Sequence, residues 1–107
     1  MSGKVSELTS QNFEEFSKEG YVLIDFFAEW CGPCVMMGPV FESLAETFEG
    51  KVKFGKVNVG EFQDIAMKFN VSSIPNFVLL KEGKVVTQFI GAMQEDVFEE
   101  KIRETLE

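Results

Sequence analysis

The residues of this chain best suited to chemistry are its two cysteines, Cys31 and Cys34, which lie three positions apart. Two cysteines placed at random in a chain of 107 residues would fall at this separation in about one case in fifty, by counting pair spacings. Gly32-Pro33 between them is typical of a helix start, where proline loses no hydrogen bond and glycine lets a substrate backbone approach. A helix start stabilises a thiolate. The spacing therefore predicts a dithiol centre in which Cys31 attacks a disulfide and Cys34, one turn later, resolves the mixed disulfide.

Three other interpretations of the pair are weaker. A structural disulfide across four residues would remove only about 2 kcal/mol of unfolded-chain entropy on the loop-closure relation. A structural zinc site needs four ligands, and the chain has no histidine and no further cysteine. Two small core residues would not explain the Trp, Gly and Pro that surround them.

Asp25 is the second informative residue, because it interrupts the otherwise apolar run at 22–27. Burial in a strand disfavours the charged form of a carboxyl group and raises its pKa. Beneath the cysteine turn, such an acid would act as a general base for Cys34. A structural carboxylate bonded to the backbone or to a lysine fits the strand equally well.

The elements that must position these residues follow from the pattern of apolar and turn residues. The apolar run at 21–28 is typical of a central strand covered on both faces, and apolar residues then recur at helical spacing until Gly50. The order of elements predicts an α/β chain with a mixed sheet and helices on both faces, and Asn70 is expected to close a helix in a left-handed conformation. Strands are expected at 5–8, 21–28, 52–59, 76–80 and 84–90, and helices after a cap at Thr9 or Ser10, after the cysteine turn, over 62–69 and over 97–106.

Length and charge restrict the partners and the compartment. We expect residues 1–107 to fold as a single domain. A net charge of −8 disfavours binding to nucleic acid or anionic lipid. The chain has no apolar run long enough to span a membrane and no signal-peptide pattern at its start, so a cytoplasmic location is expected. In that reducing compartment a cysteine pair is more often catalytic, redox-sensing or metal-binding than a permanent crosslink.

The stretch from Val22 to Cys34, which ends in Trp30-Cys31-Gly32-Pro33-Cys34, closely resembles the active-site stretch of the thioredoxin family, and the likeness covers essentially the whole chain. The resemblance implies the thioredoxin fold, a central mixed five-stranded sheet flanked by four helices. It also implies an electron-carrying protein-disulfide reductase that maintains cell redox homeostasis. The implied partners are disulfide-containing target proteins and a thioredoxin reductase. A monomer that needs no cofactor is expected.

The resemblance also assigns roles to single residues. Cys31 becomes the exposed attacking cysteine, Cys34 the buried resolving cysteine and Asp25 the buried acid that assists proton transfer. Lys56 falls where the family has a lysine near that acid, although the sequence alone favours a solvated strand lysine. Pro75 matches the family's cis-proline, a state that the sequence by itself leaves open. The substrate groove is expected to consist of Trp30, Gly32, Pro33, Ile74, Pro75, Gly91 and Ala92.

Four positions depart from the commonest family pattern without removing a catalytic atom. Phe27 replaces a frequent Trp, Val35 a frequent Lys or Arg, Gly60 a frequent acid and Asn76 the usual Thr. The Gly-Pro pair between the cysteines matches the reducing members of the superfamily, whereas relatives that form or isomerise disulfides more often have histidine there. The alternative hypothesis is a non-enzymatic thioredoxin-fold binding module or subunit that uses the same groove, and the intact cysteine pair beside a buried acid argues against it.

The uncharged residue at position 35 generates a first prediction. Val35→Lys is expected to lower the pKa of the Cys31 thiol in the reduced protein, because a cation near the start of the helix favours the thiolate. Thiol titration of the parent and the variant measures this pKa, and Val35→Gln is the uncharged control. An unchanged or raised pKa in Val35→Lys would contradict the prediction.

Overall fold

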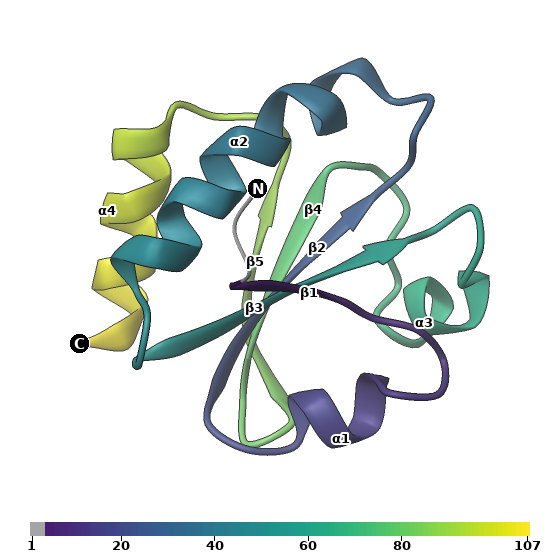
Figure 1. The fold of residues 1–107 in the computed structure, drawn as a ribbon, viewed down its shortest axis with the longest axis horizontal. Coiled ribbons are helices and arrows are strands. Elements are labelled where there is room, and N and C mark those ends of the chain that lie inside the picture. Colours follow the sequence, from purple (N-terminus) through teal and green to yellow (C-terminus); the bar gives the residue numbers. More distant parts are fainter. Residues whose placement is uncertain (1–3) are drawn as a thin grey trace.

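A five-stranded sheet in the order β1-β3-β2-β4-β5 forms the centre of the computed structural model, which describes residues 4–107 (Figure 1). The first three strands in this order are parallel to one another, and β4 and β5 are antiparallel to their neighbours. The mixed α/β sheet expected from the sequence is therefore confirmed. The strands are β1 (Val5–Glu7), β2 (Tyr21–Phe27), β3 (Val52–Asn58), β4 (Asn76–Lys81) and β5 (Lys84–Ile90).

Four helices cover the two faces of the sheet, as Figure 1 shows. α2 and α4 pack on one face, where their apolar residues form one core with Leu23, Phe54 and Phe77. α1 and α3 pack on the other face, against a core that includes Val22 and Ile24. The four helices are α1 (Phe13–Ser17), α2 (Gly32–Thr47), α3 (Gln63–Lys68) and α4 (Glu95–Leu106).

β2 is the central strand, and it pairs with β3 on one side and β4 on the other over nearly its whole length. Alternate side chains of a strand point to opposite faces. Because Leu23 belongs to the core under α2 and α4, Asp25 and Phe27 share that face. β2 ends at the same edge of the sheet as its parallel neighbours β3 and β1. The cysteine turn follows β2 at this edge, as the sequence predicted.

The first helix differs from its prediction. It begins at Phe13, after Asn12, and no side chain caps it. Thr9 instead caps the preceding turn, where its Oγ1 accepts hydrogen bonds from the backbone N–H groups of Gln11 and Asn12. The Ser10 hydroxyl donates to the carboxylate of Asp64. The predicted cap at Thr9 therefore lies one turn before α1 rather than at its first residue, and Ser10 caps neither because its hydroxyl binds Asp64.

Two turns contain left-handed residues, and that of Asn70 was predicted. Asn70 has φ of 56° and closes α3 in the left-handed region, as expected. Glu82 and Gly83 join β4 to β5 with φ of 52° and 81°, the signs of a type I′ turn. No helix among residues 4–107 is both long and apolar enough to cross a bilayer.

The packing of Gly55 in β3 generates a second prediction. A Cβ at this position would lie 2.6 Å from Cδ1 of Leu8 and 3.1 Å from Cε1 of Phe16, and Leu8 is buried. Gly55→Ala is therefore expected to lower the free energy of unfolding by about 1–3 kcal/mol through overpacking. Gly38→Ala is the matched control, because a Cβ at Gly38 meets nothing within 4 Å.

Urea unfolding of the two variants and the parent makes the comparison. Gly38→Ala lies inside α2 and is expected to raise the free energy of unfolding by up to about 1 kcal/mol, because alanine is the better helix former. Equal effects of the two substitutions would show that the contact with Leu8 does not limit the packing at Gly55.

Candidate active site

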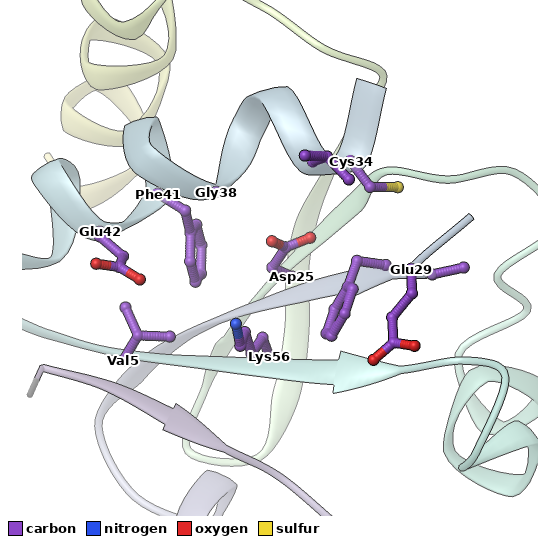
Figure 2. A pocket seen from close by; sticks show the side chains of 11 residues that line it. Val5, Asp25, Glu29, Cys34, Gly38, Phe41, Glu42 and Lys56 are labelled. Atoms are coloured by element: carbon purple, nitrogen blue, oxygen red, sulfur yellow. The ribbon is translucent and has the colours of Figure 1, made fainter. Parts of the chain in front are cut away.

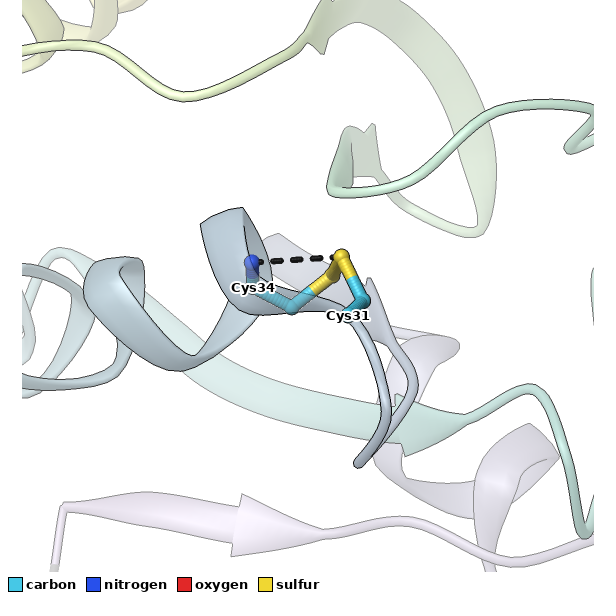
Figure 3. Close-up of a disulfide and its surroundings, with 2 residues drawn as sticks. All are labelled: Cys31 and Cys34. Carbon is cyan, nitrogen blue, oxygen red and sulfur yellow. Dashed lines mark hydrogen bonds between the residues drawn. A yellow bond between two sulfur atoms is a disulfide. The ribbon is translucent and has the colours of Figure 1, made fainter.

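Cys31 lies at the boundary between the turn after β2 and the start of α2. It is the N-cap residue of α2, with φ of −97° and ψ of 108°, and its Sγ accepts a hydrogen bond of 3.3 Å from the backbone N–H of Cys34. Pro33 lies in the first turn of the helix. A disulfide joins Cys31 to Cys34, with their Cα atoms 5.3 Å apart (Figure 3). The backbone N–H of Cys34 thus points at the sulfur of Cys31, and together with the positive end of the helix it favours negative charge there.

Both cysteines are buried in this disulfide form. The exposed fraction is 8% for Cys31 and 5% for Cys34, and the pair packs with Ala28, Val59 and Ile74. The expectation that Cys31 is exposed is therefore not met in the disulfide form, because its sulfur is covered by Cys34 and by these apolar neighbours. The neighbouring Trp30 is 79% exposed.

Asp25 lies under α2 in the middle of the sheet, where it is 4% exposed and pairs in register with Lys56 of β3. Desolvation by burial raises the pKa of Asp25 from 3.8 to about 7, and the positive charge of Lys56 opposes this shift. Oδ1 of Asp25 has no hydrogen-bond partner among the described residues. This environment is typical of a carboxyl group that exchanges a proton near neutral pH rather than of a satisfied structural carboxylate.

Asp25 and Cys34 both line a cleft of about 280 Å³. Figure 2 shows the Asp25 carboxyl between α2 and β3, with Lys56 on the strand beneath it. The Nζ of Lys56 lies 5.2 Å from the centroid of the Phe27 ring. The lining residues are Val5, Asp25, Phe27, Ala28, Glu29, Cys34, Val35, Gly38, Phe41, Glu42 and Lys56. Asp25 and Cys34 therefore face one cleft that is open to the surface.

The loop that contains Ile74 reaches the cysteines, and the loop at Gly91 is hydrogen-bonded to it. The Ile74-Pro75 peptide bond is cis, and Ile74 packs against the cysteines. The N–H of Gly91, whose φ is 96°, donates a 2.9 Å hydrogen bond to the carbonyl of Pro75 and so joins the two loops. Ala92 follows Gly91 and is exposed, as are Gly32 and Pro33 beside the cysteines.

Comparison with known proteins agrees with this geometry. The family model described as thioredoxin matches residues 4–104. The chain belongs to the thioredoxin family. It is 45% identical to a thioredoxin of Chlorobaculum thiosulfatiphilum, over 96% of this chain and 97% of that protein. It is 44% identical to thioredoxin 2 of Chlorobaculum tepidum, over 97% of each chain. It is 39% identical to a thioredoxin of Bacillus subtilis, over 95% of this chain and 98% of that protein.

Membership of the thioredoxin family identifies the chemistry of this site. The sheet order and the four helices are those of the thioredoxin fold, and the protein is a thiol-disulfide oxidoreductase whose redox-active centre is the Cys31–Cys34 pair. Among residues 4–107, no group of three or more His, Cys, Asp or Glu side chains is placed to hold a metal ion.

Sequence reasoning missed several residues around this thioredoxin-family site. Phe27 and Phe41 form apolar walls of the cleft beside Asp25, and Glu29 lies at its edge. The period of two in β2 places Phe27 on the face of Asp25, a signal that the sequence did contain. Asn76 is 2% exposed with Oδ1 unpartnered among the described residues, so the departure from threonine puts a buried amide beside Pro75.

The raised pKa of Asp25 generates a third prediction. Because the pKa of Asp25 is about 7 in the folded protein and 3.8 in the unfolded chain, the folded state binds more protons between these values. The stability of the parent is therefore expected to fall as pH rises from about 4 to about 7, by up to about 4 kcal/mol. Asp25→Asn removes the titrating group, so the variant is expected to gain stability over the parent across this range.

Urea unfolding of both proteins at a series of pH values from 4 to 9, with the disulfide kept closed, measures the difference. The gain of Asp25→Asn is expected to be small near pH 4, to increase up to about pH 7 and to stay constant above it. A difference that does not change with pH would contradict the assignment of a raised pKa to Asp25.

Proposed function

We propose that this protein is a protein-disulfide reductase in which Cys31 is the nucleophile and Cys34 the resolving thiol. The observation that carries the proposal is the position of Cys31 as N-cap of α2, with Cys34 bonded to it and Asp25 in the cleft beneath. The start of the helix stabilises a thiolate on Cys31, and the thiolate is the reactive form in disulfide exchange.

In the first step the Cys31 thiolate attacks one sulfur of a target disulfide. A bond forms between Cys31 Sγ and that sulfur, the target disulfide breaks, and the other target sulfur leaves as a thiolate that takes up a proton. The partner of Cys31 in the mixed disulfide is thus the target protein. No electron leaves the two proteins in this step.

In the second step Cys34 resolves the mixed disulfide. The cleft gives Asp25 access to the Cys34 thiol, and its pKa of about 7 suits it to accept the proton of that thiol at neutral pH. The Cys34 thiolate attacks Cys31 Sγ, the Cys31–Cys34 disulfide forms, and the second target sulfur leaves as a thiol. The target gains two electrons and two protons, and the protein is left oxidised. Lys56, the register neighbour of Asp25, favours the ionised form of the acid.

The substrate-binding surface in this proposal is the groove beside the cysteines. An extended target segment is bound by the backbone groups of Ile74 and Pro75, in the manner of an added strand. Gly91, which is hydrogen-bonded to Pro75, supports that loop. The exposed residues Trp30, Gly32, Pro33 and Ala92 complete the apolar contact.

The cellular setting belongs to the same proposal. We place the protein in the cytoplasm as a monomer, one thioredoxin domain over residues 1–107, that carries electrons and maintains redox homeostasis. A thioredoxin reductase restores the dithiol after each cycle. A binding module that uses the same groove requires neither a closable cysteine pair nor a buried acid, and it remains the alternative that the assay below tests.

Reduction of insulin with dithiothreitol as electron source supplies the fourth prediction. The parent is expected to accelerate reduction strongly, and Cys31→Ser to abolish the acceleration because no nucleophile remains. Cys34→Ser keeps the nucleophile but cannot release it, so this variant, once reduced, is expected to accumulate a mixed disulfide with insulin, measured by mass spectrometry. The two variants are matched, since each replaces one sulfur by oxygen.

Three outcomes would count against the assignment. Failure of the folded, reduced parent to accelerate insulin reduction would favour the binding module. An adduct on Cys31→Ser but not on Cys34→Ser would reverse the two roles. Full activity of Cys31→Ser would exclude Cys31 as the nucleophile.

A further inference from the structure

The edge of the sheet that carries the cysteines is acidic on one side. Glu7 ends β1, Glu29 lies two residues beyond the end of β2, and Glu61 lies three residues beyond the end of β3. These strands are parallel, so the three exposed glutamates come from one edge of the sheet, and they line one cleft of about 380 Å³. No ion pair involves any of them among residues 4–107.

The cationic side chains lie almost entirely elsewhere. All ten Lys and Arg residues are within the described chain, and only Lys56 lies near the cysteine edge. Lys56 is half-buried against the Phe27 ring, beside Asp25. The others precede the parallel strands or lie at the start of one, occupy the β4–β5 hairpin, or lie on the helices away from the cysteines. They are Lys4, Lys18, Lys51, Lys53, Lys68, Lys81, Lys84, Lys101 and Arg103.

Several acids far from the cysteines are paired with the cations found there. Ion pairs join Lys4 to Glu49 at 3.2 Å, Lys18 to Glu15 at 3.1 Å and Lys68 to Glu14 at 3.6 Å. At the cysteine edge the three exposed glutamates form no ion pair among residues 4–107 and only the half-buried Lys56 lies near them, so a net negative potential remains there.

Large apolar side chains next to the cysteines in the sequence are exposed, and Lys56 is the one cation that lines the clefts beside them among the described residues. Trp30 is 79% exposed, Val35 63% and Met36 73%. A cation at position 35, immediately after Cys34, would offset part of the negative potential, and valine does not. A target that enters the groove thus meets an apolar centre with carboxylates on one flank.

We propose that the preferred substrates of this protein are disulfides in segments that carry Lys or Arg beside the reacting cysteine, placed to reach Glu29 and Glu61. The inference rests on the proposed reductase function and specifies its substrate class. Opposite charges steer such a segment into the groove, whereas acidic segments are repelled. The effect acts mainly on the rate of association and weakens with salt, since charges at an exposed surface are screened.

Three disulfide peptides of identical core, with flanks of lysine, glutamine or glutamate, test the inference. The rate constant for reduction by the prereduced protein is divided by that for dithiothreitol, which corrects for the intrinsic reactivity of each disulfide. At low salt we expect the lysine-flanked peptide to be reduced about 3- to 10-fold faster than the glutamate-flanked one. The ratio is expected to approach one at about 1 M salt, where the screening length is about 3 Å.

Two double variants locate the effect. Glu29→Gln with Glu61→Gln is expected to bring the low-salt ratio close to one. Glu46→Gln with Glu104→Gln removes the same charge from exposed positions late in α2 and α4, and is expected to leave the ratio at the parent value. Each ratio compares the lysine-flanked and glutamate-flanked peptides with the same protein. A general loss of activity in a variant therefore lowers both rates and does not change their ratio.

The possible outcomes distinguish a failure of this substrate preference from a failure of the proposed reductase function. A parent that reduces all three peptides with equal corrected rates overturns the inference and leaves the reductase function intact. A loss of selectivity in both double variants, or in neither, also overturns it, because the selectivity would then not come from the cysteine edge. A reduced parent that acts on none of the peptides contradicts the reductase function itself.

Discussion

The carboxyl group of Asp25 lies in the central strand of the sheet, between Lys56 on β3 and Phe77 on β4, with α2 above it. A buried, incompletely hydrogen-bonded acid reduces the stability of the fold once it is ionised. The surrounding structure tolerates it because large apolar side chains form cores on both faces of the sheet. The position of this acid sets the geometry of the rest of the site, since its cleft opens directly onto Cys34.

The end of β2 and the start of α2 lie at one edge of the sheet, and the redox centre is formed there. The strand delivers the chain to the turn, and the helix supplies the N–H of Cys34, which points at the sulfur of Cys31. In the closed form the disulfide is packed with Ala28, Val59 and Ile74, and Cys34 also lines the cleft that contains Asp25. In the proposed function the target approaches from the groove of Ile74 and Pro75, and the proton of Cys34 passes to Asp25 through the cleft.

The direction of the parallel strands determines where charge lies on this fold. The parallel strands β1, β3 and β2 bring three glutamates to the cysteine edge, and the ion-paired lysines lie far from it. Trp30 and Met36 add exposed apolar surface near the cysteines. In the proposed function, recognition combines backbone contacts in the groove with the electrostatic potential of one flank.

Local spacing in the sequence was sufficient for the dithiol centre, the helix that begins at it, the apolar central strand and the left-handed Asn70, because each depends on residues only a few positions apart. Spacing also identified Asp25 as anomalous. The sequence did not determine its environment, the cis state of Ile74-Pro75, the covered state of Cys31 or the pairing of Ser10 with Asp64. Nor did it bring Glu7, Glu29 and Glu61 together. These properties arise from contacts between segments that are distant along the chain, and only the packing of strands and helices around the sheet decides which of those segments meet.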